Sequence, residues 1–190
     1  MEQLLFGIFS AFGLSASAGL NAYIPLFTIA VIAHFTNWMK LSAPYDTLSN
    51  PWIILLLGVL IIIEFLADKV PAFNHVNDLL QTFVRPIAGA IVFAASAQVL
   101  TDLNPIIPLA CGLFIAGGVH AAKALAVRPA VTAATAGAGT VPVSIAEDIL
   151  AVITSFLAIV LPIVIGCILA LLTSLLIWWL WRRSNQQVQV

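Results

Sequence analysis

The chain has 190 residues, of which 62% are hydrophobic and only 8% are charged. A soluble domain usually carries about 25% charged residues, so this composition excludes an ordinary water-facing surface and predicts a protein that folds in lipid. The net charge of -1, with no basic run longer than Arg182-Arg183, gives no sign of nucleic-acid binding.

The first predicted membrane helix covers residues 4–35, which is long for a straight crossing. Pro25 lies inside this stretch and is predicted to kink or break it. The small residues 15–19 faintly resemble a signal-peptide cleavage site. However, the segment before them has no Lys or Arg, and Glu2 has the wrong sign for a signal peptide. We therefore expect this helix to be retained.

Further membrane helices are predicted at residues 51–69, 85–100 and 105–127, each close to the roughly 20 residues that a crossing needs. The amphipathic stretch 70–84 is predicted to lie along the cytoplasmic interface. Residues 144–181 as one helix would be about 55 Å long, well beyond a hydrocarbon core of about 30 Å. We predict a turn just before Pro162, which divides this stretch into two crossings. The prediction is an all-α transmembrane bundle of about six spans.

The basic residues predict an orientation. With a cytoplasmic N-terminus, six of the seven face the cytoplasm and only Lys40 faces outward. The six are Lys69, Arg85, Lys123, Arg128, Arg182 and Arg183. This is a positive-inside pattern. We predict a multi-pass protein with both termini cytoplasmic, one transmembrane domain at 1–183 and a polar tail at 184–190.

An internal repeat is one interpretation of residues 13–22 and 112–121, which share glycines at the same offset and end on a polar residue and an alanine. It would divide the domain into inverted halves, 1–103 and 104–183, as in many transporters. The alternative is that helices rich in small residues resemble each other because they pack closely. The polar residues, Asn21 and His120, each need a partner or a wet cavity inside a membrane. For His120, a packing role and a functional role both remain open.

Ionisable residues cluster on the predicted cytoplasmic side. The acidic ones are Glu64 and Asp68, one helical turn apart, and Glu147 and Asp148, with Ser144 as a plausible N-cap of their helix. The basic ones are Lys69, Arg85, Lys123 and Arg128. Two hypotheses compete: a carboxylate site that binds a cation or proton, or an ion-pair network that joins helix ends.

Other chemistry receives little support. Arg85, before Pro86 at a predicted helix start, could hold a phosphate or lipid headgroup. Ser144 with Glu147 and His120 could form a catalytic dyad, but capping explains Ser144 better, so no enzyme is expected. No His/Cys spacing indicates a particular metal, which stays unknown, and no cofactor is predicted. Cys111 and Cys167 are expected to be packing residues.

Several motifs carry a family resemblance: EFLADKVP at 64–71, Asn77-Asp78, RPIAGA at 85–90, HAAK at 120–123, Arg128 and VSIAED at 143–148. With residues 17–26, they resemble the domain-of-unknown-function family 4126 over nearly the whole chain. The resemblance implies a bacterial inner-membrane protein of unassigned activity and supplies no substrate. In that family's first motif we expect Arg at the position of Asn21.

The leading hypothesis is a small transporter or channel for a cation or a proton-coupled solute, working as a homo-oligomer among membrane lipids. Its site would comprise Glu64, Asp68, Glu147, Asp148, Asn21 and His120. One alternative is binding or translocation of an anionic lipid headgroup by Arg85, Lys123 and Arg128. Another is a structural scaffold in which the charges only join helices. The solute or ion is not specified by the sequence.

Overall fold

The computed structural model describes residues 2–67, 71–98 and 104–187, and all regular structure in these ranges is helical. This confirms the predicted all-α class. The elements are α1 (Glu2–Leu20), α2 (Tyr23–Phe35), the 3-10 turn η1 (Tyr45–Ser49), α3 (Pro51–Ala67), α4 (Pro71–Ser96), α6 (Ile106–Ala122), the π-helical turn η2 (Lys123–Val127), α7 (Arg128–Thr135), α8 (Thr140–Val160) and α9 (Pro162–Gln187). The predicted site residues Asp68 and Lys69 lie outside the described residues.

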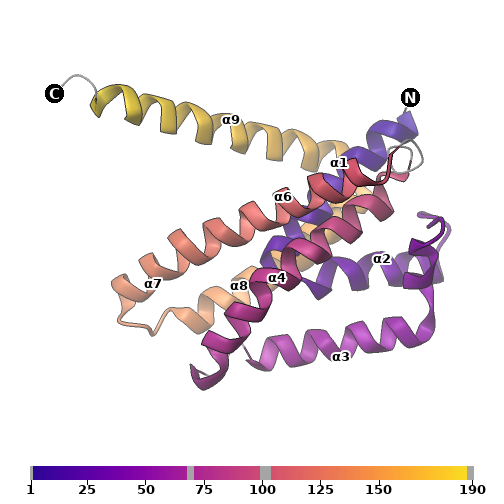
Figure 1. Cartoon of the computed structure of the whole chain (residues 1–190), viewed down its shortest axis with the longest axis horizontal. Coiled ribbons are helices and arrows are strands. Elements are labelled where there is room, and N and C mark those ends of the chain that lie inside the picture. Colours follow the sequence, from indigo (N-terminus) through magenta and orange to yellow (C-terminus); the bar gives the residue numbers. More distant parts are fainter. Residues whose placement is uncertain (1, 68–70, 99–103, 188–190) are drawn as a thin grey trace.

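Helices α1 and α2 form a hairpin (Figure 1). Leu14 and Ile29 belong to one packed cluster, although 15 residues of continuous helix would separate them by about 22 Å. Both ends of the hairpin lie beside the end of α4. Gly7 faces the carbonyl oxygen of Ser96, and the carbonyl of Lys40 accepts a hydrogen bond from Gln98. The prediction that residues 4–35 make a single crossing is therefore wrong, whereas the predicted break within this stretch is present.

Pro25 explains where the chain turns. Proline has no N–H to bond to the carbonyl of residue 21, and its ring clashes with that carbonyl. A helix that continued from α1 would therefore be broken at this point. α1 ends at Leu20, and Pro25 itself lies in the first turn of α2, where its missing N–H has no cost. The predicted break is real, but it lies four residues before the proline.

Two other predicted helix boundaries differ from the observed ones, at the starts of α4 and α8. α4 runs unbroken from Pro71 through Pro86 to Ser96, so Arg85 lies within a helix and not at its start. The amphipathic stretch 70–84 is mostly the first half of this helix. α8 begins at Thr140, which places Ser144 one turn inside, buried, and not at the N-cap. The turn before Pro162 is as predicted, since α8 ends at Val160 and α9 begins at Pro162.

The compared segments 13–22 and 112–121 do not have the geometry of an inverted repeat. Ala11 shares a cluster with Cys111, while Gly19 contacts Ala116 and Val119 further along α6. α1 and α6 thus lie side by side and run in the same direction, whereas matching helices of an inverted repeat run in opposite directions. Their shared small residues have a packing explanation.

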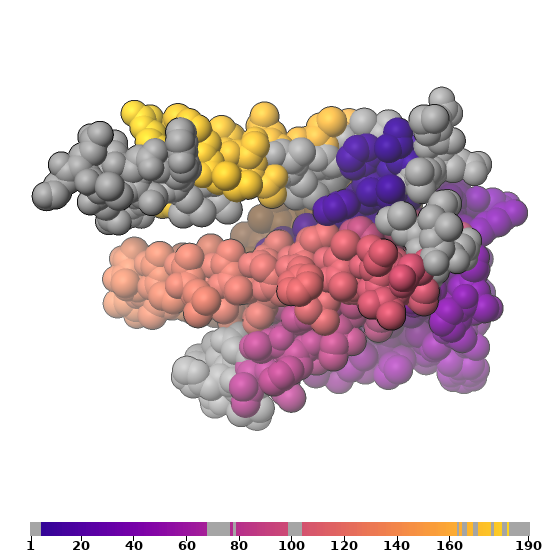
Figure 2. Space-filling view, turned by 45° about the horizontal axis from the view of Figure 1, so that its top comes forward, coloured from indigo at the N-terminus to yellow at the C-terminus, as the bar shows by residue number. Residues whose placement is uncertain are grey.

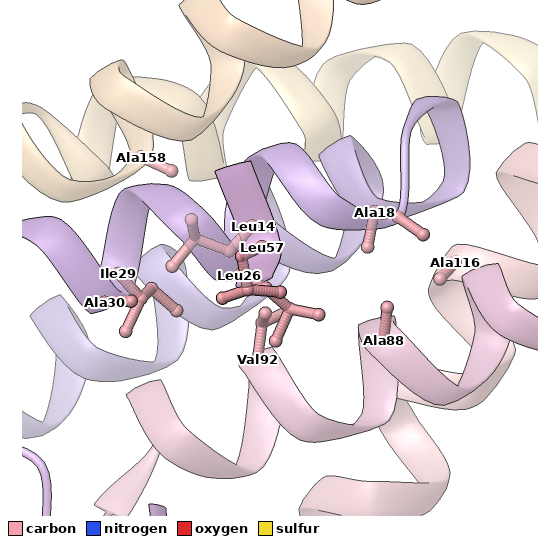
Figure 3. Packing of buried hydrophobic residues seen from close by; sticks show 11 residues of the cluster. Leu14, Ala18, Leu26, Ile29, Ala30, Leu57, Ala88, Val92, Ala116 and Ala158 are labelled. Atoms are coloured by element: carbon pink, nitrogen blue, oxygen red, sulfur yellow. The ribbon is translucent and has the colours of Figure 1, made fainter. Parts of the chain in front are cut away.

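The hairpin packs against α4 and α6 at very short range. A Cβ on Gly19 would lie 2.6 Å from the carbonyl oxygen of Ala116, and one on Gly89 would overlap Ala116 and the backbone of Gly112. Ser15 donates a 2.8 Å hydrogen bond to the Gly89 carbonyl. Figure 3 shows the neighbouring hydrophobic cluster, in which Leu14, Leu26 and Val92 meet between α1, α2 and α4. Small residues let these backbones approach each other, as in membrane helix pairs.

The outer surface of the bundle is apolar. Three stretches of the described chain are long and apolar enough to cross a membrane: Leu79–Ser96, Ile106–Thr135 and Thr140–Val160. Exposed Leu, Ile and Phe side chains cover the outward faces of α3, α4, α6 and α8. α9 contacts α1 and α8 and diverges from α6 and α7 toward the C-terminus (Figures 1 and 2). These features identify a membrane protein.

Candidate functional site

The tip of the α1–α2 hairpin leaves backbone groups without helical partners, and side chains replace those partners. Asn21 is 1% exposed. Its Oδ1 accepts hydrogen bonds from the N–H groups of Tyr23 (3.1 Å) and Ile24 (3.2 Å), so it caps the first turn of α2. Its Nδ2 donates to Oδ1 of Asp148 on α8 at 3.0 Å. One side chain thus starts α2 and joins the tip to a carboxylate.

A second group of polar side chains joins α3, α4 and α6 beside the tip. Nη2 of Arg85 lies 3.0 Å from Oε1 of Glu64, and the two side chains are each 1% exposed. Nη1 of Arg85 lies 3.3 Å from Nδ1 of His120, and Nε2 of His120 lies 3.2 Å from Oγ1 of Thr82. Because arginine can only donate, Nδ1 accepts, and the imidazole proton sits on Nε2 facing Thr82.

A third group closes the C-terminal end of α1. Nζ of Lys123 donates to the carbonyl oxygen of Leu20 at 3.2 Å and lies 2.7 Å from Oε2 of Glu147. An ammonium beside the last carbonyls of a helix is favourable because those carbonyls carry partial negative charge. Arg128 approaches the same oxygen of Glu147 at 3.8 Å, with its own side chain 23% exposed.

The π-helical turn η2 places Lys123 and Arg128. It interrupts the regular helix between α6 and α7, and it begins three residues after the buried His120. A π-turn shifts the following side chains around the helix axis, and such turns often occur at functional sites. Here Lys123 and Arg128, five positions apart, both reach Glu147.

Asp148 differs from Glu64 and Glu147 because no cation in the described part of the chain pairs with it. Its Oδ1 accepts from Asn21, and its Oδ2, like Oε2 of Glu64, is buried without a hydrogen-bond partner in the described part of the chain. Asp148 and Asn21 are among the residues that line a pocket of about 320 Å³, whose other lining residues are all apolar. Those residues are Ile24 of α2, Ile61 and Phe65 of α3, and Ile149, Val152 and Ile153 of α8.

Most of the predicted site residues come together. Glu64, Glu147, Asp148, Asn21, His120, Arg85, Lys123 and Arg128 all belong to the three groups around the tip. Arg85 lies well inside its helix, 14 residues from the start of α4 and 11 from its end, whereas Asn21 lies in the turn between α1 and α2. An anion site at a helix start, suggested above for Arg85, has no structural basis because Arg85 is buried and paired.

Sequence reasoning missed three participants. They are the carbonyl of Leu20, the hydroxyl of Thr82 and the half-buried Tyr23, whose phenol faces Gln81 and the charges of Glu64 and Arg85. For Thr82 the sequence did carry a signal, since a polar residue stands there four positions before Pro86. Among the described residues, no group of three or more His, Cys, Asp or Glu side chains is placed to hold a metal.

Comparison with known proteins gives one match. The model of a family described as "Domain of unknown function (DUF4126)" matches residues 8–183. No curated protein and no solved structure matches this chain.

Proposed function

The chain belongs to the DUF4126 family, and because that description assigns no activity, we propose a function from the geometry of the hairpin tip. We propose that the protein is a small multi-pass transporter or channel that moves a cation or a proton-coupled solute past this tip. The observation that carries the proposal is the turn between α1 and α2, surrounded by buried charges from α3, α4 and α8.

Membrane physics supports this proposal. Non-helical backbone at membrane depth is tolerated only where protein buries it or where it lines a polar cavity. In transporters, interrupted helices direct their carbonyls and N–H groups at substrates and coupling ions. Leu20 and Asn21 provide one carbonyl and one capped helix start at the same point.

The charged residues have different roles in the proposal. Glu64 with Arg85, and Glu147 with Lys123, hold the hairpin tip in place because each pair joins different helices. Asp148 and Asn21 contact the transported species, because Oδ2 of Asp148 is the buried carboxylate oxygen that adjoins a pocket. His120 lines the path beside Arg85.

The hairpin changes the proposed topology. If α1–α2 enters and leaves on one side, α3, α4, α6–α7, α8 and α9 make the crossings, and the termini lie on opposite sides. The end of the bundle with Lys123, Arg128 and Arg182 would face the cytoplasm, and the N-terminus would share the outer side with Lys40. Labelling single cysteines placed at Gln3 and Gln187 in intact cells tests this: the proposal predicts labelling at residue 3 only.

Proton or cation flux in proteoliposomes tests the proposal. The purified chain is reconstituted with a trapped pH-sensitive dye, and a potassium gradient with valinomycin drives the flux. We expect wild type to dissipate the gradient faster than protein-free liposomes, and Asp148→Asn and Glu64→Gln to lose most of that rate. Asp46→Asn makes the same chemical change at an exposed position of the 3-10 turn η1 and should match wild type. Equal rates in wild type and protein-free liposomes would contradict the proposal.

A structural scaffold is the second candidate, and the ion pairs favour it. Glu64 and Glu147 both have basic partners, as a network that only joins helices would require. The pocket beside Asp148 is the observation against it, since joining helices needs no cavity. The lipid-headgroup hypothesis receives less support, because Arg85 and Lys123 are buried and paired with carboxylates.

A further inference from the structure

The pocket beside Asp148 has features that specify a chemical class of ligand. Its walls come from α2, α3 and α8, and side chains such as Phe65 (40%), Ile149 (54%) and Val152 (52%) are substantially exposed on the outer surface of the bundle. In a membrane protein that surface meets lipid. The pocket is therefore a lateral groove, open toward the bilayer, with an apolar surface and the carboxylate oxygen Oδ2 of Asp148 buried behind it.

Asp148, one of the two polar residues that line the groove, has an unsatisfied acceptor. Oδ2 of Asp148 is buried without a hydrogen-bond donor in the described part of the chain, and no cation described there pairs with this carboxylate. A buried acceptor without a donor is costly, and the cost is larger for a charged group. A ligand that brings a charged donor removes this cost. Binding requires the partly exposed Asp148 side chain to rotate so that the buried Oδ2 faces the groove.

We propose that this groove binds a compact organic ammonium, with N–H donating to Oδ2 of Asp148 and an apolar body against Ile61, Phe65 and Val152. The inference rests on the proposed function, in which it names the substrate class. An ammonium complements the carboxylate by charge and supplies the missing donor. The apolar body matches the aliphatic and aromatic walls, and a volume of about 320 Å³ suits a single small organic molecule.

The groove favours a free amine over an amine-bearing phospholipid. In a phospholipid a phosphate separates the ammonium from the acyl chains, so binding through the ammonium would place an anion against apolar walls and close to Asp148. The groove instead requires the apolar body to adjoin the nitrogen. A phospholipid occupant is therefore a test outcome that would overturn the proposal.

Binding to the full chain in phosphatidylcholine nanodiscs tests the proposal directly, with 4-phenylbutylammonium as the probe and isothermal titration calorimetry as the measurement. 4-Phenylbutan-1-ol, of similar shape but uncharged, is the matched ligand. We expect the ammonium to bind at least about tenfold more tightly than the alcohol, the size of one charge-assisted hydrogen bond. Equal affinities, or no binding of the ammonium, would overturn the proposal.

Two variants locate the site. Asp148→Asn should weaken ammonium binding by about tenfold or more and leave alcohol binding unchanged, because only the charged contact is lost. Val152→Phe should fill the groove and weaken both ligands. Asp46→Asn makes the same exchange, and Leu150→Phe introduces the same aromatic ring, at exposed positions outside the groove; both should bind like wild type. If Asp148→Asn does not fold, Val152→Phe and the ligand pair still decide the outcome.

A final competition measurement distinguishes a free amine from a phospholipid headgroup as the ligand. Phosphatidylethanolamine added to the nanodiscs should not displace the probe, and displacement would mean that the groove holds a lipid headgroup. Failure here is distinguishable from failure of the transport proposal. Proton or cation flux without ammonium binding overturns only the substrate class, whereas ammonium binding without flux identifies a binding protein that does not transport.

Discussion

The two sides of the hairpin tip differ in how the helices pack and in how their buried carboxylates are paired. Toward α4 and α6, glycines bring backbones into contact and every described carboxylate has a basic partner. Toward α3 and α8, the packing opens into a groove and Asp148 has only a neutral amide partner. The contrast falls between adjacent residues, since Glu147 pairs with Lys123 while Asp148 faces the groove.

This difference assigns separate roles to the two sides: one stabilises the fold and the other binds a ligand. A buried charge with a well-placed partner keeps its geometry, and removing one partner leaves the other uncompensated. A buried carboxylate oxygen without a donor adds nothing to stability and gains from a ligand that supplies one. We therefore expect substitutions on the closed side to reduce stability and substitutions on the groove side to reduce binding. Four predictions test this, from the largest expected effect to the smallest.

Arg85→Met should have the largest effect on stability. It leaves Glu64 buried without its arginine, and breaking such a pair costs about 3–5 kcal/mol. Thermal denaturation in detergent should show a large fall in the midpoint. The double variant Arg85→Met, Glu64→Leu should recover much of the loss, because no uncompensated charge remains. A double variant as unstable as Arg85→Met alone would show that the pair is not the cause.

Lys123→Met should cost somewhat less, about 3 kcal/mol at most, because Arg128 remains 3.8 Å from Glu147 and can move closer. Arg128→Met is the matched comparison and should cost less again, since Arg128 is partly exposed and more distant. Denaturation midpoints of both variants provide the order. If Arg128→Met proved the more destabilising of the two, Lys123 would not be the principal partner of Glu147.

Gly89→Ala should destabilise by about 1–3 kcal/mol, because the new methyl group overlaps Ala116 and the backbone of Gly112. Gly118→Ala on α6 is the control, since nothing lies within 4 Å of a Cβ at that position. There the helix should gain slightly, as alanine is the better helix former. Equal midpoints for the two variants would contradict the close packing of α4 against α6.

Asp148→Asn should change stability least, by under about 1 kcal/mol, because the asparagine oxygen still accepts from Asn21 and no ion pair is lost. Glu147→Gln, the adjacent residue with the same chemical change, should cost clearly more because it leaves Lys123 and Arg128 without their carboxylate. If Asp148→Asn lowered stability more than Glu147→Gln, the side assigned to ligand binding would instead be the one that stabilises the fold.

The sequence by itself determined that the chain folds in lipid and which residues form the site. A chain with so few charges can only bury its surface in lipid, and each remaining buried charge then needs a partner, which is why eight of the predicted residues meet. The turn before Pro162 also followed from the sequence, because one continuous helix would exceed the bilayer and the proline marks where it breaks.

Only the tertiary structure decided the direction of the chain and the choice of partners. Hydropathy indicates which residues lie in lipid but not the direction in which the chain runs. It therefore could not show that residues 4–35 turn back at Asn21. The parallel course of α1 and α6 likewise depends on contacts between residues about 100 positions apart. Glu147 and Asp148 are equivalent in sequence, and only the packing of α3, α6 and α8 gives one of them a cation and the other a groove.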